Sequence, residues 1–194
     1  MALRDEHWAE SSIHELVVSF LQSERDKYYA QAGPDVLRLI DAPDVGDPRQ
    51  NGVRLRLLYQ MRRWLLGEIP PDTQWYRVRL LRDGHLPELR IIARCSWDAK
   101  PGEAHDDNEL PRAAFRHSQP LRGDPNSWRG VVLWGHDRSG PFTILEGNHR
   151  LAAYVSSGGH GLAIETFVGT SPSNCFWHIH DPPDLILNDL WKPP

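Results

Sequence analysis

The feature that most constrains the fold is a β-hairpin pattern in the second half of the chain. Residues 130–135 form an apolar run between glycines, which is typical of a strand. Residues 137–140 read Asp-Arg-Ser-Gly, a turn composition, and residues 142–145 predict the return strand. Two short apolar runs joined by such a turn predict a hairpin.

A glycine turn then joins the hairpin to a helix. Residues 146–150 read Glu-Gly-Asn-His-Arg, residues 151–155 have strong helix-forming content, and residues 162–168 predict a further strand. The unpaired amides of a first helical turn, together with the helix dipole, favour a phosphate group. The order hairpin, turn, helix and strand therefore predicts an α+β fold with an anion site at the turn.

The side chains of this turn suit phosphate chemistry. Arg150 carries a planar, permanently charged guanidinium that matches phosphate oxygens. His149 can supply a further donor, or a proton, near neutral pH. Glu146 could orient the arginine or hold a metal. The alternative interpretation is that the turn is a folding feature in which Arg150 pairs internally with Glu146 or a nearby aspartate.

The string Gly147-Asn148-His149-Arg150, placed between a hairpin and an alanine-rich helix, resembles the signature of the ParB/sulfiredoxin superfamily. The resemblance covers residues 130–169, about a fifth of the chain. Members share a Gly-x-x-Arg turn that grips nucleotide phosphates: ParB proteins bind CTP there, and sulfiredoxins and free-serine kinases bind ATP or ADP. The resemblance implies that Gly147, Asn148, His149 and Arg150 bind a nucleotide together with Mg²⁺.

Two departures narrow the resemblance. Sulfiredoxins carry a cysteine nucleophile where this chain has Asn148, and an amide cannot perform that attack, so sulfinic acid reduction is disfavoured. ParB clamp proteins carry a helix-turn-helix region after the nucleotide fold, whereas few residues follow Gly169 here. The 22 Lys and Arg residues are outnumbered by 26 Asp and Glu residues, and the net charge of −4 argues against DNA binding.

The leading functional prediction is a nucleotide-dependent, ATP-type phosphotransferase that acts on a small molecule or a modified residue. We assign His149 and Glu146 to catalysis and expect Arg150→Ala to remove nucleotide binding with little loss of stability. By analogy with the serine kinases, an upstream carboxylate would be the base, with candidates Asp98, Glu103, Asp106, Asp107 and Glu109. The alternatives are a non-catalytic nucleotide-binding or partner-binding module and a nuclease-like toxin.

The N-terminal part, residues 1–70, predicts helices, and residues 71–194 predict the domain with the small mixed sheet. Ser12 and Glu15 have capping-box spacing, and Asp47-Pro48 is a second helix start. Gly67 is the expected end of that second helix. We interpret its arginines as a solvated face, with an anion-binding patch as the alternative; they are Arg54, Arg56, Arg62 and Arg63.

Between the helices and the hairpin, residues 75–81 and 89–97 predict strands, with a turn at Asp83-Gly84. Residues 111–117 predict a short helix. After the last strand, Ser171, Ser173 and Asn174 form either a substrate loop near the same sheet edge as the turn or an ordinary polar turn. Cys175 is expected to be a buried, inert thiol. His178 and His180 share the spacing of a strand face, but the pair alone does not make us predict a metal site.

The remaining features predict a soluble, cytoplasmic protein. No apolar run approaches the roughly 20 residues that a membrane-spanning helix needs, and the first residues lack the apolar core of a signal peptide. Cys95 and Cys175 are too few for a disulfide framework. The expected partners are therefore a nucleotide and a small-molecule acceptor, without a membrane.

Overall fold

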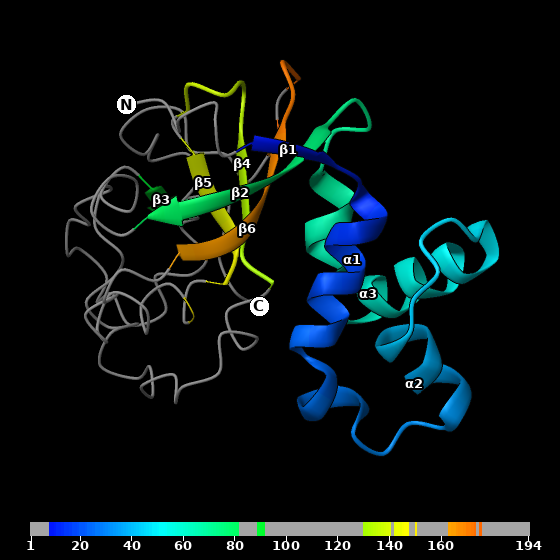
Figure 1. The fold of residues 1–194 in the computed structure, drawn as a ribbon. Helices are drawn as coiled ribbons and strands as arrows, with labels where there is room; N and C mark the ends of the chain where they lie inside the picture. The colour runs from blue at the N-terminus through cyan, green and yellow to red at the C-terminus, as the bar shows by residue number, and fades with distance from the viewer. Residues whose placement is uncertain are drawn as a thin grey trace, which may run out of the picture.

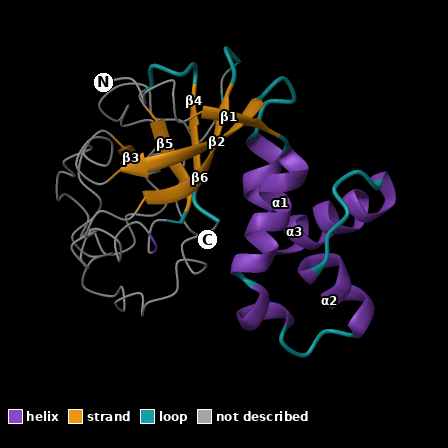
Figure 2. Cartoon of the chain, in the orientation of Figure 1, coloured by secondary structure: helices purple, strands orange, loops and turns teal. Residues whose placement is uncertain are grey.

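The chain folds as a helical layer against a mixed β-sheet, an α+β architecture (Figures 1 and 2). The computed structural model describes residues 8–81, 89–91, 130–140, 142–147, 150, 163–173 and 175. The helices are α1 (Ile13–Ser23), α2 (Pro34–Asp41) and α3 (Pro48–Glu68). The strands are β1 (Trp8–Ser11), β2 (Gln74–Leu81), β3 (Leu89–Ile91), β4 (Val132–Gly135), β5 (Phe142–Glu146) and β6 (Ala163–Thr170).

Helix α1 begins as the sequence predicts. The Ser12 hydroxyl accepts a hydrogen bond from the Glu15 amide at 3.2 Å, and the Glu15 carboxylate accepts one from the Ser12 amide at 3.2 Å. This capping box pairs two amides that a helix start leaves unsatisfied. After the C-cap Glu24, the chain makes a π-helical turn, η2 (Arg25–Tyr29), in which no residue is buried.

Helix α3 also begins at the predicted residues. The Asp47 carboxylate accepts hydrogen bonds from the amides of Arg49, at 2.8 Å, and Gln50, at 3.4 Å, and these bonds lower the pKa of Asp47. Pro48 occupies the first helical position. The helix continues through Gly67 to Glu68, and it is kinked at Arg62, whose backbone is not helical (φ −135°, ψ 46°).

The sheet has the strand order β1-β2-β6-β4-β5-β3. The predicted hairpin is confirmed, because β4 and β5 pair antiparallel, and β6 runs parallel to β4 on its other side. Strands β2 and β3 are not neighbours, although a turn signal lies between them; β3 instead pairs parallel with β5 at the far edge. Strand β1 precedes the helices and pairs with β2 at the opposite edge.

The core lies between the helical layer and the sheet. Helices α1 and α3 lie on one side of the sheet, with α2 farther out (Figure 1). The buried residues of this core come from three helices and four strands and include Cys175, which is 2% exposed; they are Leu16, Val17, Phe20, Leu21, Ile40, Leu58, Trp75, Val132, Trp134, Leu145, Phe167 and Cys175. A contiguous core of this kind supplies the main stabilisation of the fold.

The solvated-face interpretation of the α3 arginines is wrong for Arg54. This side chain is fully buried and donates hydrogen bonds to the carbonyl oxygens of Asp44, at 2.7 Å, and Leu39, at 3.3 Å, and to the side chains of Asn51 and Gln50. Burial lowers the pKa of Arg54. The arginine therefore ties the loop between α2 and α3 to the helix. Of the three arginines whose side chains the structure describes, Arg56 is exposed and Arg62 is partly buried, and the side chain of Arg63 lies outside the description.

Several predicted elements lie outside the described residues. They are the strand continuation over 92–97, the turn at Asp83-Gly84, the helix over 111–117 and the helix over 151–155. Among the residues that the structure does describe, no helix is both long enough and apolar enough to cross a membrane.

The capping box yields a stability prediction. Ser12→Ala removes the acceptor for the Glu15 amide, and we expect the free energy of unfolding to fall by about 1 kcal/mol. Ser19→Ala, within the same helix, is the matched control and should change stability by less than about 0.5 kcal/mol. Urea denaturation of both variants measures the difference, and equal effects would contradict the role of the cap.

Candidate functional site

The turn after β5 is built around one backbone conformation. Gly147 has φ +95°, a left-handed conformation that residues with a Cβ rarely adopt. A Cβ on Gly147 would lie 2.9 Å from Val131 Cγ2 and 3.0 Å from Val131 Cα, so the turn packs closely on the residue directly before β4. Arg150, three residues later, is helical. The structure therefore has a left-handed glycine between the end of a strand and a helical residue.

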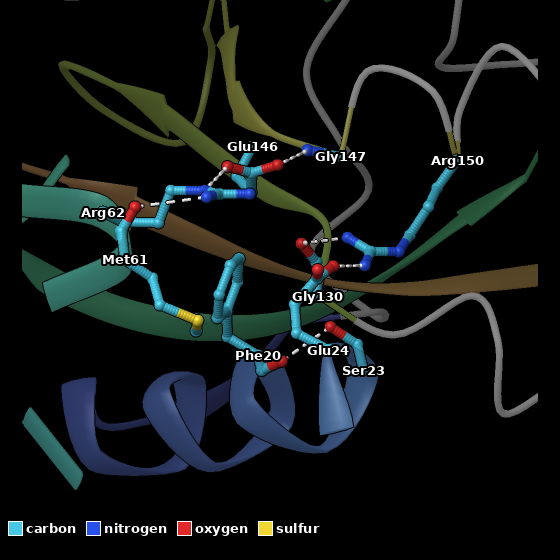
Figure 3. A network of polar contacts seen from close by, with 9 residues as sticks. All are labelled: Phe20, Ser23, Glu24, Met61, Arg62, Gly130, Glu146, Gly147 and Arg150. Carbon is cyan, nitrogen blue, oxygen red and sulfur yellow. Dashed lines mark hydrogen bonds and ion pairs between the residues drawn. The ribbon is translucent and has the colours of Figure 1, made fainter. Parts of the chain in front are cut away.

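Glu146, which ends β5, is engaged on both sides. Its Oε2 accepts from Arg62 Nε at 2.7 Å, and its Oε1 accepts from the Gly147 amide at 3.1 Å (Figure 3). Both side chains of the pair are largely buried, with 21% of Arg62 and 17% of Glu146 exposed. The Arg62 guanidinium also lies over the Phe20 ring, 5.4 Å from its centre. This carboxylate thus links the turn to α3.

Arg150 points away from the turn towards α1 (Figure 3). Its Nη2 donates to the Glu24 carboxylate in an ion pair, and its Nη1 lies 3.5 Å from the carbonyl oxygen of Gly130. Both side chains are largely buried, with 16% of Arg150 and 8% of Glu24 exposed. The internal pairing that the sequence left open as an alternative is present, but the partner is Glu24 rather than Glu146 or an aspartate.

The electrostatics explain why Glu24 needs this partner. Glu24 is the C-cap of α1, where the helix dipole disfavours a negative charge, and burial removes the water that would solvate it. Arg150 supplies the compensating charge. Removing one member of a buried pair leaves the other uncompensated, which typically costs about 3–5 kcal/mol. Arg150 is therefore a structural residue as well as a candidate phosphate ligand.

The predicted substrate loop lies elsewhere. Ser171 follows β6, and its amide donates to the Gly135 carbonyl at the end of β4, whereas Gly147 packs against Val131, before β4 begins. The two sites are therefore at opposite ends of β4. The expectation that Ser171 and Ser173 share an edge with the turn is wrong.

A hydrogen-bonded cluster fastens Ser171 and Ser173 to the chain before β2. The Ser171 hydroxyl donates to Asp72 Oδ1 at 2.8 Å, and the Ser173 hydroxyl donates to Asp72 Oδ2 at 3.0 Å. The Ser173 amide donates to Ser171 Oγ at 3.0 Å, and a ring nitrogen of His136 lies 3.1 Å from the Ser171 carbonyl oxygen. These contacts describe an ordered loop, in agreement with the polar-turn alternative.

Other candidate residues lie outside the described part of the chain. They are Asn148, His149, Asn174, the acidic candidates Asp98, Glu103, Asp106, Asp107 and Glu109, and the pair His178 and His180. Among the described residues, no group of three His, Cys, Asp or Glu side chains gathers in a way that could hold a metal ion.

Helical periodicity contains a signal that identifies the partners of the turn. Glu24 stands four residues after the buried Phe20, so it continues the apolar face of α1. Arg54, Leu58 and Arg62 form a similar row on α3 at intervals of four. A charged residue in an apolar row indicates a buried partner, and this pattern separates Arg54 and Arg62 from the exposed Arg56.

Comparison with known proteins adds no further assignment. No family model, curated protein or solved structure matches the chain.

The Gly147 conformation yields a second prediction. Gly147→Ala places a Cβ against Val131 in a left-handed conformation. The conformation alone costs about 1–2 kcal/mol, and the contact with Val131 adds to this cost, so we expect the free energy of unfolding to fall by more than that amount. Gly52→Ala is the control, because Gly52 is helical with no atom within 4 Å of the added Cβ, and it should stabilise by about 0.5–1 kcal/mol. Thermal or urea denaturation separates the two, and a Gly147→Ala protein as stable as wild type would refute the turn geometry.

The Asp72 cluster yields a prediction about pH. The hydrogen bond from Ser171, with a further one from Ser173, lowers the pKa of Asp72 in the folded protein. Its contribution to stability is fully present above the ordinary aspartate pKa of about 4 and is lost as the pH falls through the lowered value. The stability difference between wild type and Asp72→Asn should therefore shrink on acidification below about pH 4.

Urea denaturation between neutral pH and the acid limit of folding tests this prediction. Asp35→Asn is the control, because Asp35 is exposed and lies 3.8 Å from Arg38 in a weak ion pair. A wild-type advantage over Asp72→Asn that stayed constant across the acid range would contradict the assignment.

Proposed function

We propose that the turn from Gly147 to Arg150 binds the phosphate groups of a nucleotide, and that the protein is a nucleotide-dependent phosphotransferase acting on a small molecule or a modified residue. The observation that supports this proposal is the left-handed Gly147 between the end of β5 and the helical Arg150. A reversal of this kind presents main-chain amides at a helix start, where phosphate is favoured.

The residues of the turn have distinct roles in this proposal. Gly147 shapes the turn so that the amides of residues 148–150 cradle the phosphates, the Arg150 guanidinium neutralises their charge, and His149 donates to the transferring group. The substrate is the magnesium complex of ATP or of another nucleoside triphosphate. The core around this turn is proposed to have the ParB/sulfiredoxin arrangement, and the reaction is proposed to take place in the cytoplasm.

The ion pair with Arg62 redefines the role of Glu146. Its two oxygens hold the Arg62 guanidinium and the Gly147 amide, so its carboxylate orients the turn. A base towards the acceptor hydroxyl is better sought in the acidic segment between Asp98 and Glu109. In the proposal, Glu146 thus positions the phosphate site and does not itself move a proton.

A second candidate function is a nucleotide-binding module without turnover. One observation favours it: the charged residues on both sides of the turn, Glu146 and Arg150, are bound to helices rather than directed at a shared reaction centre. In such a module, occupation of the turn would be transmitted to α1 and α3. Single-turnover assays with the bound nucleotide distinguish the two candidates.

Calorimetric titration with ATP, ADP, CTP and GTP, each with Mg²⁺, tests the proposed site. Arg150→Ala alone is unsuitable, because it would leave the buried Glu24 carboxylate without its cation and lower stability. The double variant Glu24→Gln/Arg150→Gln removes the guanidinium while keeping the net charge and a neutral pair. We expect wild type to bind one nucleotide saturably and the double variant to bind none.

The control is the exposed pair on the sheet, Arg77 and Glu165, whose nearest charged atoms are 4.0 Å apart. The variant Arg77→Gln/Glu165→Gln makes the same change in charges and should bind like wild type. Absence of heat with folded wild-type protein would reject the phosphate site, as would unchanged binding by the Glu24→Gln/Arg150→Gln protein.

A further inference from the structure

The arginine of the turn already has an anionic ligand within the protein. The Glu24 carboxylate binds the same guanidinium that a nucleotide phosphate would need (Figure 3). The planar guanidinium of arginine can bind either a carboxylate or a phosphate through two N–H groups, so the two anions compete for the same donors. A phosphate that binds Arg150 fully must therefore displace Glu24 or share the guanidinium with it.

Displacement requires that Glu24 reach water. A carboxylate that is 8% exposed at a helix C-terminus is unstable once its cation is withdrawn. The adjacent segment η2 begins at the next residue and contains no fully buried side chain. It is attached through Tyr29, which packs on the core and donates to Met61 Sδ at 3.5 Å, and through the exposed pair of Arg25 with Asp41. An outward movement of η2 with Glu24 must therefore break these contacts.

Helices α1 and α3 contact the turn through Glu24 and Arg62, and both helices depart from regular geometry at these residues. The π-helical turn η2 begins directly after Glu24, and α3 is kinked at Arg62. Such π-helical turns occur frequently at functional sites. The Arg62 pair differs from the Glu24 pair, because Arg62 also packs on the buried Phe20 ring. The pair of Arg62 with Glu146 is therefore held by packing as well as by charge.

We propose that Glu24 is an internal competitor for Arg150, and that a phosphate-bearing ligand at the turn displaces its carboxylate and releases the end of α1 with η2. This inference rests on the proposed nucleotide site. The buried face of α1 and the pair between Arg62 and Glu146 stay in place, so the movement is confined to residues 24–29. Ligand binding is thereby linked to a change on the surface formed by η2.

The test compares nucleotide affinities of wild type, Glu24→Gln and Glu10→Gln. The ligands are the magnesium complexes of ATP, ADP, CTP and GTP, with inorganic phosphate as a separate arm. Glutamine at position 24 keeps the shape but not the charge of the competitor, so we expect binding about 5- to 150-fold tighter, the usual range for coupled sites. Glu10 is exposed on β1, and Glu10→Gln should bind like wild type.

Hydrogen exchange on wild-type protein gives an independent readout. Saturation with the bound nucleotide should speed exchange at the amides of residues 24–29 and leave those of residues 16–21 unchanged. This measurement also decides the question if Glu24→Gln fails to fold. Unchanged or slower exchange at residues 24–29 would overturn the proposed release.

The affinities separate the remaining outcomes. Equal affinity of wild type and Glu24→Gln would overturn the competition, and weaker binding by Glu24→Gln would overturn it in favour of a positioning role for Glu24. Absence of binding by all three folded proteins would instead reject the phosphate site itself, and the inference with it.

Discussion

The arrangement around the turn depends on the burial of one face of α1 against the sheet. Leu16, Val17, Phe20 and Leu21 are at most 1% exposed, and side chains of this size each gain about 1.5–3 kcal/mol from full burial. That burial fixes the rotation of the helix about its axis. Because Glu24 is one turn after Phe20, the same rotation directs its carboxylate at the sheet instead of at water. Arg150 is then required as its counter-charge.

Elements that are encoded by neighbouring residues could be predicted from the sequence. The capping box at Ser12, the cap at Asp47-Pro48 and the hairpin of β4 and β5 are each encoded within a few residues, and each is confirmed. The ion pairs could not be assigned in this way. Arg62 and Glu146 are 84 residues apart, and Glu24 and Arg150 are 126 apart. Periodicity marks Glu24 and Arg62 as charges on apolar faces, but it does not identify their partners.

The order of the strands in the sheet likewise could not be predicted from neighbouring residues. Strands β1 and β3 are four and three residues long, and their positions at opposite edges of the sheet follow from pairing with β2 and β5. A turn signal between β2 and β3 does not make them neighbours, because β2 is paired with β1 on one side and with β6 on the other. The placement of Ser171 follows from the parallel pairing of β4 and β6, since parallel strands end at the same edge. That edge is the one opposite the turn.

A Gly-x-x-Arg turn can therefore serve the fold and a ligand through the same guanidinium. A structural arginine and a phosphate-binding arginine look alike in sequence, and both need a nearby anion. What separates them physically is whether the internal anion can be released. For Glu146 and Arg62, release would disturb the packing on Phe20. For Glu24, the neighbouring η2 has no fully buried residue, and release would instead have to break the packing of Tyr29 and the exposed pair of Arg25 with Asp41. The function of Arg150 thus depends on the segment after Glu24 as much as on the turn itself.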